Sequence, residues 1–251
     1  MQYVFLVGGF GTRLGQRTKT TPKPLLSIAG KPFLLHLIKW AKAASAHQVL
    51  LLSGYKGGQI QEFAKTHSTK ELPIEVVQEN APLGTGGSIL NARQCLEDQF
   101  IAANGDSWLA FDPTSLSDMF SKHKDIDGVM ALRHLDNTAS SGIVHLNQDD
   151  IITHFEERGG NHPGLINAGI YHLKKAVLDN PNCPEGVFSI ERDFFPKLAK
   201  ENKLAGQTFD RFFIDIGTPD NFEKADQTFF DEMKNFASSH PQNPNFMDMI
   251  K

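Results

Sequence analysis

The stretch LVGGFGTRLG (Leu6–Gly15) places four glycines around Thr12 and Arg13, directly after an apolar run that begins at Tyr3. A continuous apolar run that ends in glycine is typical of a β-strand buried on both faces. Because glycine has no side chain, backbone N–H groups in such a loop can approach an anion closely. The stretch therefore predicts a buried first strand followed by an anion-binding loop.

Two familiar phosphate-binding patterns do not fit this loop. The dinucleotide pattern G-x-G-x-x-G, read from Gly9, requires glycine where the chain has Leu14, and the P-loop pattern G-x-x-x-x-G-K-[ST] does not occur. Instead the loop has its own cation, Arg13, and Lys23 follows between two prolines that stiffen its backbone. A tight turn with a surface arginine is the alternative reading.

Strand-like and helical patterns alternate through the first part of the chain. The predicted strands are 3–7, 48–54, 73–79 and 100–106, and the predicted helices are 30–44, 58–67 and 85–97. Strands that alternate with helices at this interval form right-handed βαβ units. We therefore expect an α/β fold with a Rossmann-like open, mostly parallel sheet and helices on both faces.

Further along, strand-like runs at 128–135, 141–147, 151–157 and 165–173 have few helices between them. They predict a small added β region, either at the sheet edge or as an antiparallel cover. A helix at 190–200, a strand at 211–217 and a helix that begins at Thr218 and Pro219 follow. We expect one domain over residues 1–237. Residues 238–251 form a polar tail, expected to be disordered or docked on a neighbouring subunit.

Composition restricts the choice of partners. The chain has 251 residues, 40% of them apolar, and a formal net charge of −4, whereas nucleic-acid or membrane-surface binding favours a basic face. No apolar run approaches the ~20 residues of a membrane span. The two cysteines suggest neither a metal knot nor a disulfide framework. The sequence predicts a cytoplasmic protein without a nucleic-acid or membrane partner, and it leaves a homodimer open.

Two aspartates form a candidate metal site. Asp106 and Asp215 each follow an apolar strand-like run, and ligands of open α/β sheets collect at the carboxyl ends of the strands. Mg²⁺ prefers one or two carboxylates together with phosphate oxygens and water. Asp215 lies between two isoleucines, so its burial requires a cation or hydrogen-bond donors. Two capping or salt-bridged aspartates are the alternative.

The sequence also resembles a known family. Gly8–Leu14 followed by Pro22-Lys23-Pro24 resembles the signature of the sugar-1-phosphate nucleotidylyltransferases, the NDP-sugar pyrophosphorylases. Four more motifs resemble that family in its order: PLGTGGSI (82–89), NGD (104–106), NAG (167–169) and FIDIGTPD (213–220). The resemblance covers about residues 1–235. The compact length and the PLGTGG form look most like the heptose 1-phosphate guanylyltransferases, with mannose-1-phosphate guanylyltransferases and N-acetylmuramate-1-phosphate uridylyltransferases as alternatives.

This resemblance implies a Mg²⁺-dependent reaction of a nucleoside triphosphate, GTP in the first instance, with a sugar 1-phosphate. It implies catalytic roles for Arg13 and Lys23 and metal binding by Asp106 and Asp215. The implied nucleotide-binding residues are Gly8, Gly9, Gly11, Thr12, Gln78, Gly84, Thr85 and Gly86. The implied sugar-phosphate-binding residues are Asn104, Arg158, Asn167, Gly169 and Glu191. The family usually has lysine where this chain has Arg158. Arginine keeps the positive charge but presents a planar guanidinium group in place of an ammonium group.

The same residues give less support to two other functions. A non-catalytic nucleotide or sugar-phosphate sensor of this fold is expected to lose one of the four charged residues Arg13, Lys23, Asp106 and Asp215, and all four are present. A Rossmann-type dehydrogenase lacks support because the sixth-position glycine is missing. The sequence therefore favours a nucleotidylyltransferase.

Overall fold

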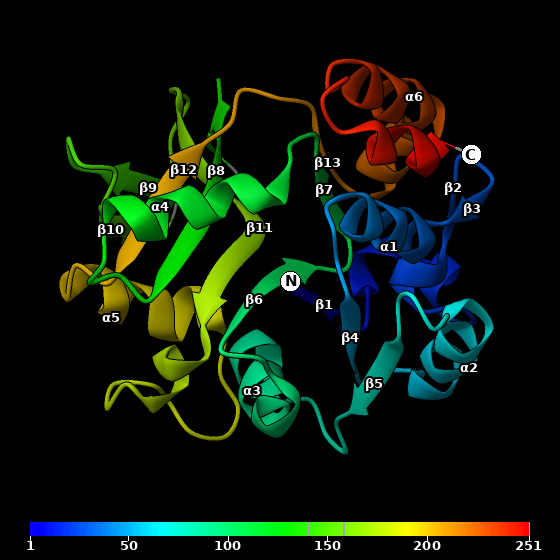
Figure 1. Ribbon diagram of the computed structural model, residues 1–251, viewed down its shortest axis with the longest axis horizontal. Coiled ribbons are helices and arrows are strands. Elements are labelled where there is room, and N and C mark those ends of the chain that lie inside the picture. The colour runs from blue at the N-terminus through cyan, green and yellow to red at the C-terminus, as the bar shows by residue number, and fades with distance from the viewer. Residues whose placement is uncertain (140, 158, 251) are drawn as a thin grey trace. The chain divides into compact units, whose positions relative to one another are not determined.

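The computed structural model describes residues 1–139, 141–157 and 159–250. Its main sheet has seven strands in the order β12-β8-β11-β6-β1-β4-β5, and Figure 1 labels these strands and the helices. The strands are β1 Gln2–Leu6, β4 Gln48–Ser53, β5 Ile74–Gln78, β6 Gln99–Asn104, β8 Gly128–Leu135, β11 Gly164–Lys174 and β12 Leu204–Thr208. Strand β1 is parallel to β4, β4 to β5 and β12 to β8, whereas β11 is antiparallel to β8. The predicted α/β fold with a mostly parallel sheet is confirmed.

The helices largely follow the predicted pattern. They are α1 Phe33–Ala43, α2 Gly57–His67, α3 Gly84–Asn91, α4 Ser117–Lys122, α5 Phe195–Lys200 and α6 Pro219–Ser238. Helix α6 begins as expected, because the Thr218 hydroxyl accepts a hydrogen bond from the Asn221 N–H at 3.3 Å. Helix α3 ends earlier than predicted, and a separate 3₁₀ turn follows at Arg93–Cys95. Among the described residues, no helix combines the length and apolar character that a bilayer crossing requires.

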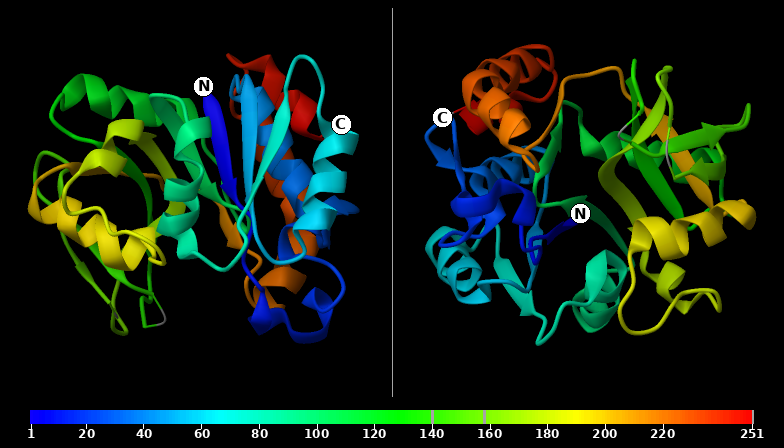
Figure 2. Two further views of the ribbon diagram at one scale, coloured as in Figure 1. Left: turned by 90° about the horizontal axis from the view of Figure 1, so that it is seen from below. Right: turned by 180° about the vertical axis from the view of Figure 1, so that it is seen from behind.

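The chain divides into two compact units, and each is described by itself. The first comprises Met1–Pro82, Ala103–Asp112 and Phe212–Lys251. Its strands β1 and β4 lie side by side, which Figure 2 also shows. Its core contains Trp108, whose ring lies edge-on to Phe229 at 5.1 Å and to Phe236 at 5.8 Å. These aromatic contacts fix α6 in the first unit.

Two short pairs of strands complete the first unit. Strand β7 (Ser107–Leu109) is antiparallel to β13 (Phe213–Asp215), and β2 (Ser27–Ile28) is antiparallel to β3 (Lys31–Pro32). The sequence pattern predicts a strand at 211–217 but gives no sign of β7, which is only three residues long. The β7–β13 pair matters for function, because it joins segments that are far apart in the chain.

The second unit comprises Leu83–Ala102 and Pro113–Arg211. Strands β8, β11 and β12 belong to the main sheet, while β9 (Ile143–Leu146) and β10 (Ile152–Glu156) form a separate antiparallel hairpin. Both predicted arrangements of the added β region therefore occur. Strands β8, β11 and β12 extend the main sheet, and β9 with β10 forms the small antiparallel element. The predicted helix at 190–200 is a π-helical turn, η6 (Ile190–Phe194), that leads into α5.

The C-terminal segment differs from the expected polar tail. Residues Pro244–Ile250 form a 3₁₀ helix, η7, which lies beside α1 and α6 (Figure 1). Phe246 is fully buried, with its ring centroid 4.8 Å from that of Phe236, and the Asn243 side chain donates a hydrogen bond to the Ala43 carbonyl at 3.2 Å. The segment packs on its own unit because Phe246 and Met249, three residues apart, bury together despite their polar neighbours.

We expect Phe246→Ala to lower the free energy of unfolding by about 3–5 kcal/mol, the usual cost of truncating a buried phenylalanine. The matched control is Met247→Ala, because Met247 is exposed, and it should change stability by less than ~0.5 kcal/mol. Urea unfolding of both variants measures the difference. Equal, small effects would mean that the segment does not pack on the first unit in solution.

Candidate active site

The glycine loop after β1 has a backbone that only glycine adopts easily. Gly11 has a positive φ of 64°, and a Cβ atom there would lie 2.8 Å from the Thr18 side chain. The short 3₁₀ helix η1 (Thr12–Thr18) begins directly after Gly11 without a side-chain cap. The first N–H groups of a helix have no partner within it, so those near Thr12 and Arg13 can bind an anion. The predicted phosphate loop has suitable geometry.

Lys23 is a buried cation with a carboxylate partner. Only 8% of the residue is exposed, and its ammonium group forms an ion pair with Asp106. Flanking residues Pro22 and Pro24 fix the backbone around it, and Pro24 lies in the short 3₁₀ helix η2 (Lys23–Leu25). A buried charge is stable only when paired, so Lys23 depends on this carboxylate.

The β7–β13 pair brings the two predicted metal ligands together. Asp215 is in register with Ser107, the residue after Asp106, and the Ile216 N–H donates to the Asp106 carbonyl at 2.9 Å. The Ser107 hydroxyl donates to the Asp106 carboxylate at 3.1 Å, and the Gly217 N–H donates to the Asp215 carboxylate. Two carboxylates from distant segments thus share one location, as predicted.

The surroundings of Asp215 disfavour the negative charge of its carboxylate. Burial raises the pKa of its carboxyl group, and the nearby Asp106 carboxylate raises it further. Lys23, the Gly217 N–H and Arg13 act in the opposite direction but do not cancel the rise. A divalent cation between the carboxylates would relieve this repulsion, and an oxygen-only donor set of two carboxylates fits Mg²⁺.

Gly217 marks the point where the charged side chains converge. A Cβ atom at Gly217 would lie 2.5 Å from the Asp215 Oδ1 atom and 3.0 Å from both Arg13 Nη2 and Lys23 Nζ. The sequence motifs did not point to Gly217, although a glycine two residues after an aspartate flanked by isoleucines was the available signal. We call Arg13, Lys23, Asp106 and Asp215 the charged cluster.

Other predicted residues of the first unit lie near the same strand ends. The Gly105 N–H donates to the Leu6 carbonyl at 3.0 Å, which holds the NGD motif with Asn104 beside the end of β1. A Cβ atom at Gly8 would lie 3.1 Å from a Glu79 carboxylate oxygen. The exposed Gln78 side chain instead accepts a hydrogen bond from Gln61 on α2 at 3.0 Å. The nucleotide-binding role of Gln78 stays a prediction.

A separate polar network lies in the second unit, with Glu191 at its centre. The Thr85 hydroxyl donates to the Glu191 carboxylate at 2.5 Å and accepts from the Ile190 N–H at 3.0 Å. The same carboxylate accepts from Ser189 at 2.7 Å and from the Tyr171 hydroxyl at 3.3 Å. Predicted residues Thr85 and Glu191, about a hundred positions apart in the chain, therefore contact each other directly.

The network continues to the NAG motif. The Asn167 side chain donates to the Tyr171 hydroxyl at 2.9 Å and accepts from the Gly169 N–H at 2.7 Å. Gly169 has a φ of 74° where the β8–β11 register shifts, so glycine is required at this bulge. Tyr171 was missed, although its spacing of four from Asn167 along a strand was a signal. We call Thr85, Asn167, Tyr171, Ser189 and Glu191 the polar network.

The glycines of PLGTGG pack closely against Phe188. Cβ atoms at Gly84 and Gly86 would overlap the Phe188 backbone and ring respectively, and the N–H groups of Gly86 and Gly87 donate to the Phe188 carbonyl at 3.1 and 3.3 Å. These glycines thus have a packing role, and nucleotide binding by Gly84 and Gly86 stays a prediction. Arg158 lies outside the described residues.

Comparison with known proteins identifies relatives. Residues 2–232 match the Nucleotidyl transferase family model. The D-glycero-alpha-D-manno-heptose 1-phosphate guanylyltransferase of Aneurinibacillus thermoaerophilus is 34% identical over 229 residues, 90% of this chain and 96% of that protein. The mannose-1-phosphate guanylyltransferase of Mycobacterium tuberculosis is 36% identical over 87% of this chain and 62% of that protein. The structure of Yersinia pseudotuberculosis HddC complexed with GMP-PN has a TM-score of 0.78 and 31% identity, covering 91% of this chain and 99% of HddC.

We expect Gly86→Ala to destabilise the protein by about 1–3 kcal/mol, because the new methyl group overlaps the buried Phe188 ring. Gly58→Ala is the matched control, since an added Cβ there meets nothing within 4 Å, and it should be neutral or stabilising by up to ~1 kcal/mol. Urea unfolding measures both. Equal stability of the two variants would show that Phe188 does not require a glycine beneath it.

We also expect Asp215→Asn to raise the melting temperature at pH 7 in chelator. A raised folded-state pKa means that ionised Asp215 costs stability, and the cost grows as pH rises above the unfolded pKa of about 3.9. The gain should therefore shrink in acid, while added Mg²⁺ should stabilise the wild type and not Asp215→Asn. Asp210→Asn, at an exposed position, should change neither property. A lower melting temperature for Asp215→Asn in chelator would contradict this.

Proposed function

The chain belongs to the nucleotidyl transferase family, and we propose that it transfers the guanylyl group of GTP to a heptose 1-phosphate and releases pyrophosphate. The convergence of Arg13, Lys23 and Asp215 at Gly217, with Asp106 paired to Lys23, is the observation that carries the proposal. The charged cluster has two positive and two negative groups, so a bound divalent cation would leave it strongly positive. Such a site favours a triphosphate.

No covalent nucleophile is needed in this reaction. A phosphate oxygen of the sugar 1-phosphate attacks the α-phosphorus of GTP, a new P–O bond forms, and the bond from the α-phosphorus to the bridging oxygen breaks as pyrophosphate leaves. The attacking oxygen is already anionic, so catalysis consists of positioning and charge stabilisation.

Each cation of the charged cluster has a distinct role in the proposal. Arg13 and the N–H groups of the Gly8–Thr12 loop would hold the β- and γ-phosphates, which leave as pyrophosphate. Lys23 would stabilise charge on the α-phosphate. Its ammonium group has three N–H donors, so it can bind Asp106 and a phosphate oxygen together.

We assign the metal to Asp106 and Asp215. Their shared position and the raised pKa of Asp215 support a divalent cation, and their oxygen-only donors favour Mg²⁺. When bound, Mg²⁺ would neutralise negative charge on the reacting phosphates. The two carboxylates would hold this ion, while Lys23 keeps its bond to Asp106.

Two residues of the polar network, Glu191 and Asn167, would bind the sugar. Glu191 and Asn167 have carboxylate and amide groups suited to sugar hydroxyls, and their mutual hydrogen bonds through Tyr171 fix their orientation. Asn104, Arg158 and the Gly169 backbone complete the proposed sugar-phosphate contacts. Gln78, Gly84, Thr85 and Gly86 complete the nucleotide contacts, and cytoplasmic location and a homodimer stay predictions.

Mannose 1-phosphate is the second candidate substrate, because the Mycobacterium tuberculosis relative named for mannose 1-phosphate has 36% identity. Heptose 1-phosphate is the first candidate because the chain spans 96% of the relative named for heptose 1-phosphate. It spans 62% of the relative named for mannose 1-phosphate. Both candidates share the guanylyl group and the same charged cluster.

A pyrophosphate-release panel tests the proposal. It crosses GTP, ATP, UTP and dTTP with heptose, mannose, glucose and N-acetylmuramate 1-phosphates, and GTP with heptose 1-phosphate should give the highest kcat/KM. Lys23→Ala should lower kcat about 10²–10³-fold, as loss of one transition-state donor does. Lys19→Ala, at an exposed neighbouring position, should leave kcat unchanged.

The panel separates the reaction from its substrates. A preference for UTP or dTTP would overturn the guanylyl assignment and leave the nucleotidyltransferase assignment intact. Full activity of Lys23→Ala would remove Lys23 from the mechanism.

A further inference from the structure

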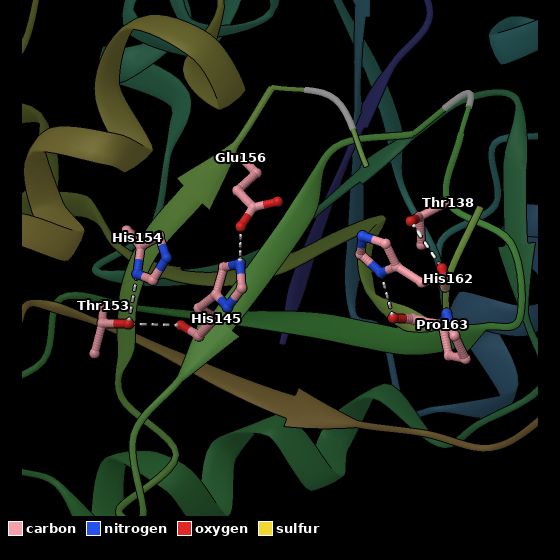
Figure 3. Close-up of polar contacts among 7 residues, drawn as sticks. All are labelled: Thr138, His145, Thr153, His154, Glu156, His162 and Pro163. Carbon is pink, nitrogen blue, oxygen red and sulfur yellow. Dashed lines mark hydrogen bonds and ion pairs between the residues drawn. The ribbon is translucent and has the colours of Figure 1, made fainter. Parts of the chain in front are cut away.

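The β9–β10 hairpin of the second unit carries two histidines and a glutamate that the proposed reaction does not use. His145 on β9 is in register with His154 on β10, and Glu156 follows two residues later on β10. Cross-strand partners and residues two apart in a strand project from the same face. The three side chains therefore share one face of the hairpin, as Figure 3 shows.

These side chains already lie close together. The imidazole rings of His145 and His154 are stacked, with centroids 4.0 Å apart and an interplanar angle of 5°. The Glu156 carboxylate lies 2.9 Å from the His145 Nε2 atom, and one ligand atom from each residue lies within 4.8 Å of the others. Four-coordinate zinc with Zn–N bonds of about 2.0 Å needs ligand atoms about 3.3 Å apart. Side-chain rotation at this accessible face can supply that adjustment.

The donor set selects a class of metal. Two imidazole nitrogens and one carboxylate oxygen suit a borderline ion such as Zn²⁺, whereas Mg²⁺ prefers oxygen ligands alone. Histidines that bind metals usually have a hydrogen-bond partner on the ring nitrogen that faces away from the metal. Thr153 provides such a partner here, because its hydroxyl lies 3.1 Å from the His154 Nδ1 atom. The same hydroxyl donates to the His145 carbonyl at 3.2 Å. The contact with Nδ1 orients the His154 ring and leaves its Nε2 atom available.

We propose that His145, His154 and Glu156 form a binding site for a divalent transition-metal ion, Zn²⁺ above others, separate from the carboxylate pair of the charged cluster. Three protein ligands leave one coordination position of a tetrahedral ion for water. The bound ion links β9 to β10 and stabilises the hairpin, because it binds the folded register and not the separated strands.

Isothermal titration of the metal-stripped full chain with Zn²⁺, in excess Mg²⁺, tests the site. We expect one Zn²⁺ per chain, a rise in melting temperature with Zn²⁺, and visible absorption typical of a tetrahedral site when Co²⁺ replaces Zn²⁺. His154→Ala should weaken Zn²⁺ binding at least ~10-fold, since loss of an outer-shell partner alone often costs 10–100-fold. It should also abolish the rise in melting temperature.

Matched variants exclude other ligands. His162→Ala removes an exposed histidine whose ring bonds the Pro163 carbonyl and which lies outside the cluster (Figure 3), and Cys95→Ser removes an exposed thiol. Both should bind Zn²⁺ like the wild type. Absence of Zn²⁺ binding by the wild type, unchanged binding by His154→Ala, or equal loss in either control would overturn the proposal. Circular dichroism confirms that each variant is folded.

Discussion

The pairing of β7 with β13 is the constraint on which the charged cluster depends. These three-residue strands come from positions about a hundred residues apart, and their register sets Asp215 beside the residue that follows Asp106. Burial raises the pKa of the Asp215 carboxyl group, and repulsion between the two carboxylates raises it further. Lys23 and Arg13 offset part of this repulsion. The folded protein therefore stores an electrostatic cost that a divalent cation would relieve.

Glycines solve two different problems in this chain. Gly217 leaves room for the charged groups of Asp215, Arg13 and Lys23, whereas Gly11 adopts a left-handed turn close to the Thr18 side chain. Gly84 and Gly86 instead let α3 approach Phe188, and Gly87 lets it approach the Gly186 carbonyl. Sequence motifs do not distinguish these roles, because both produce glycine at a fixed position. The PLGTGG motif thus has a structural explanation independent of any nucleotide.

Much of the fold followed from periodicity, because strands such as β4 are long apolar runs and helices such as α1 have apolar residues at helical spacing. Periodicity could not reveal β7, which is too short, or the folding back of η7, where Phe246 and Met249 decide the packing among polar residues. The joining of Asp106 to Asp215 was expected from strand ends. Tyr171 and Gly217 were not expected, since their roles depend on side chains and turns that meet only in three dimensions.

Donor chemistry separates two metal assignments in one chain. The charged cluster offers carboxylate oxygens and contains two cations that suit phosphates, whereas the β9–β10 hairpin offers imidazole nitrogens. The most direct test of the first assignment is a crystal structure with a non-hydrolysable GTP analogue and Mn²⁺, located by anomalous scattering. We predict a manganese peak bound by Asp106 and Asp215, with phosphate oxygens bonded to Arg13 and Lys23. A triphosphate bound away from these two cations, with no metal between the carboxylates, would contradict the proposed mechanism.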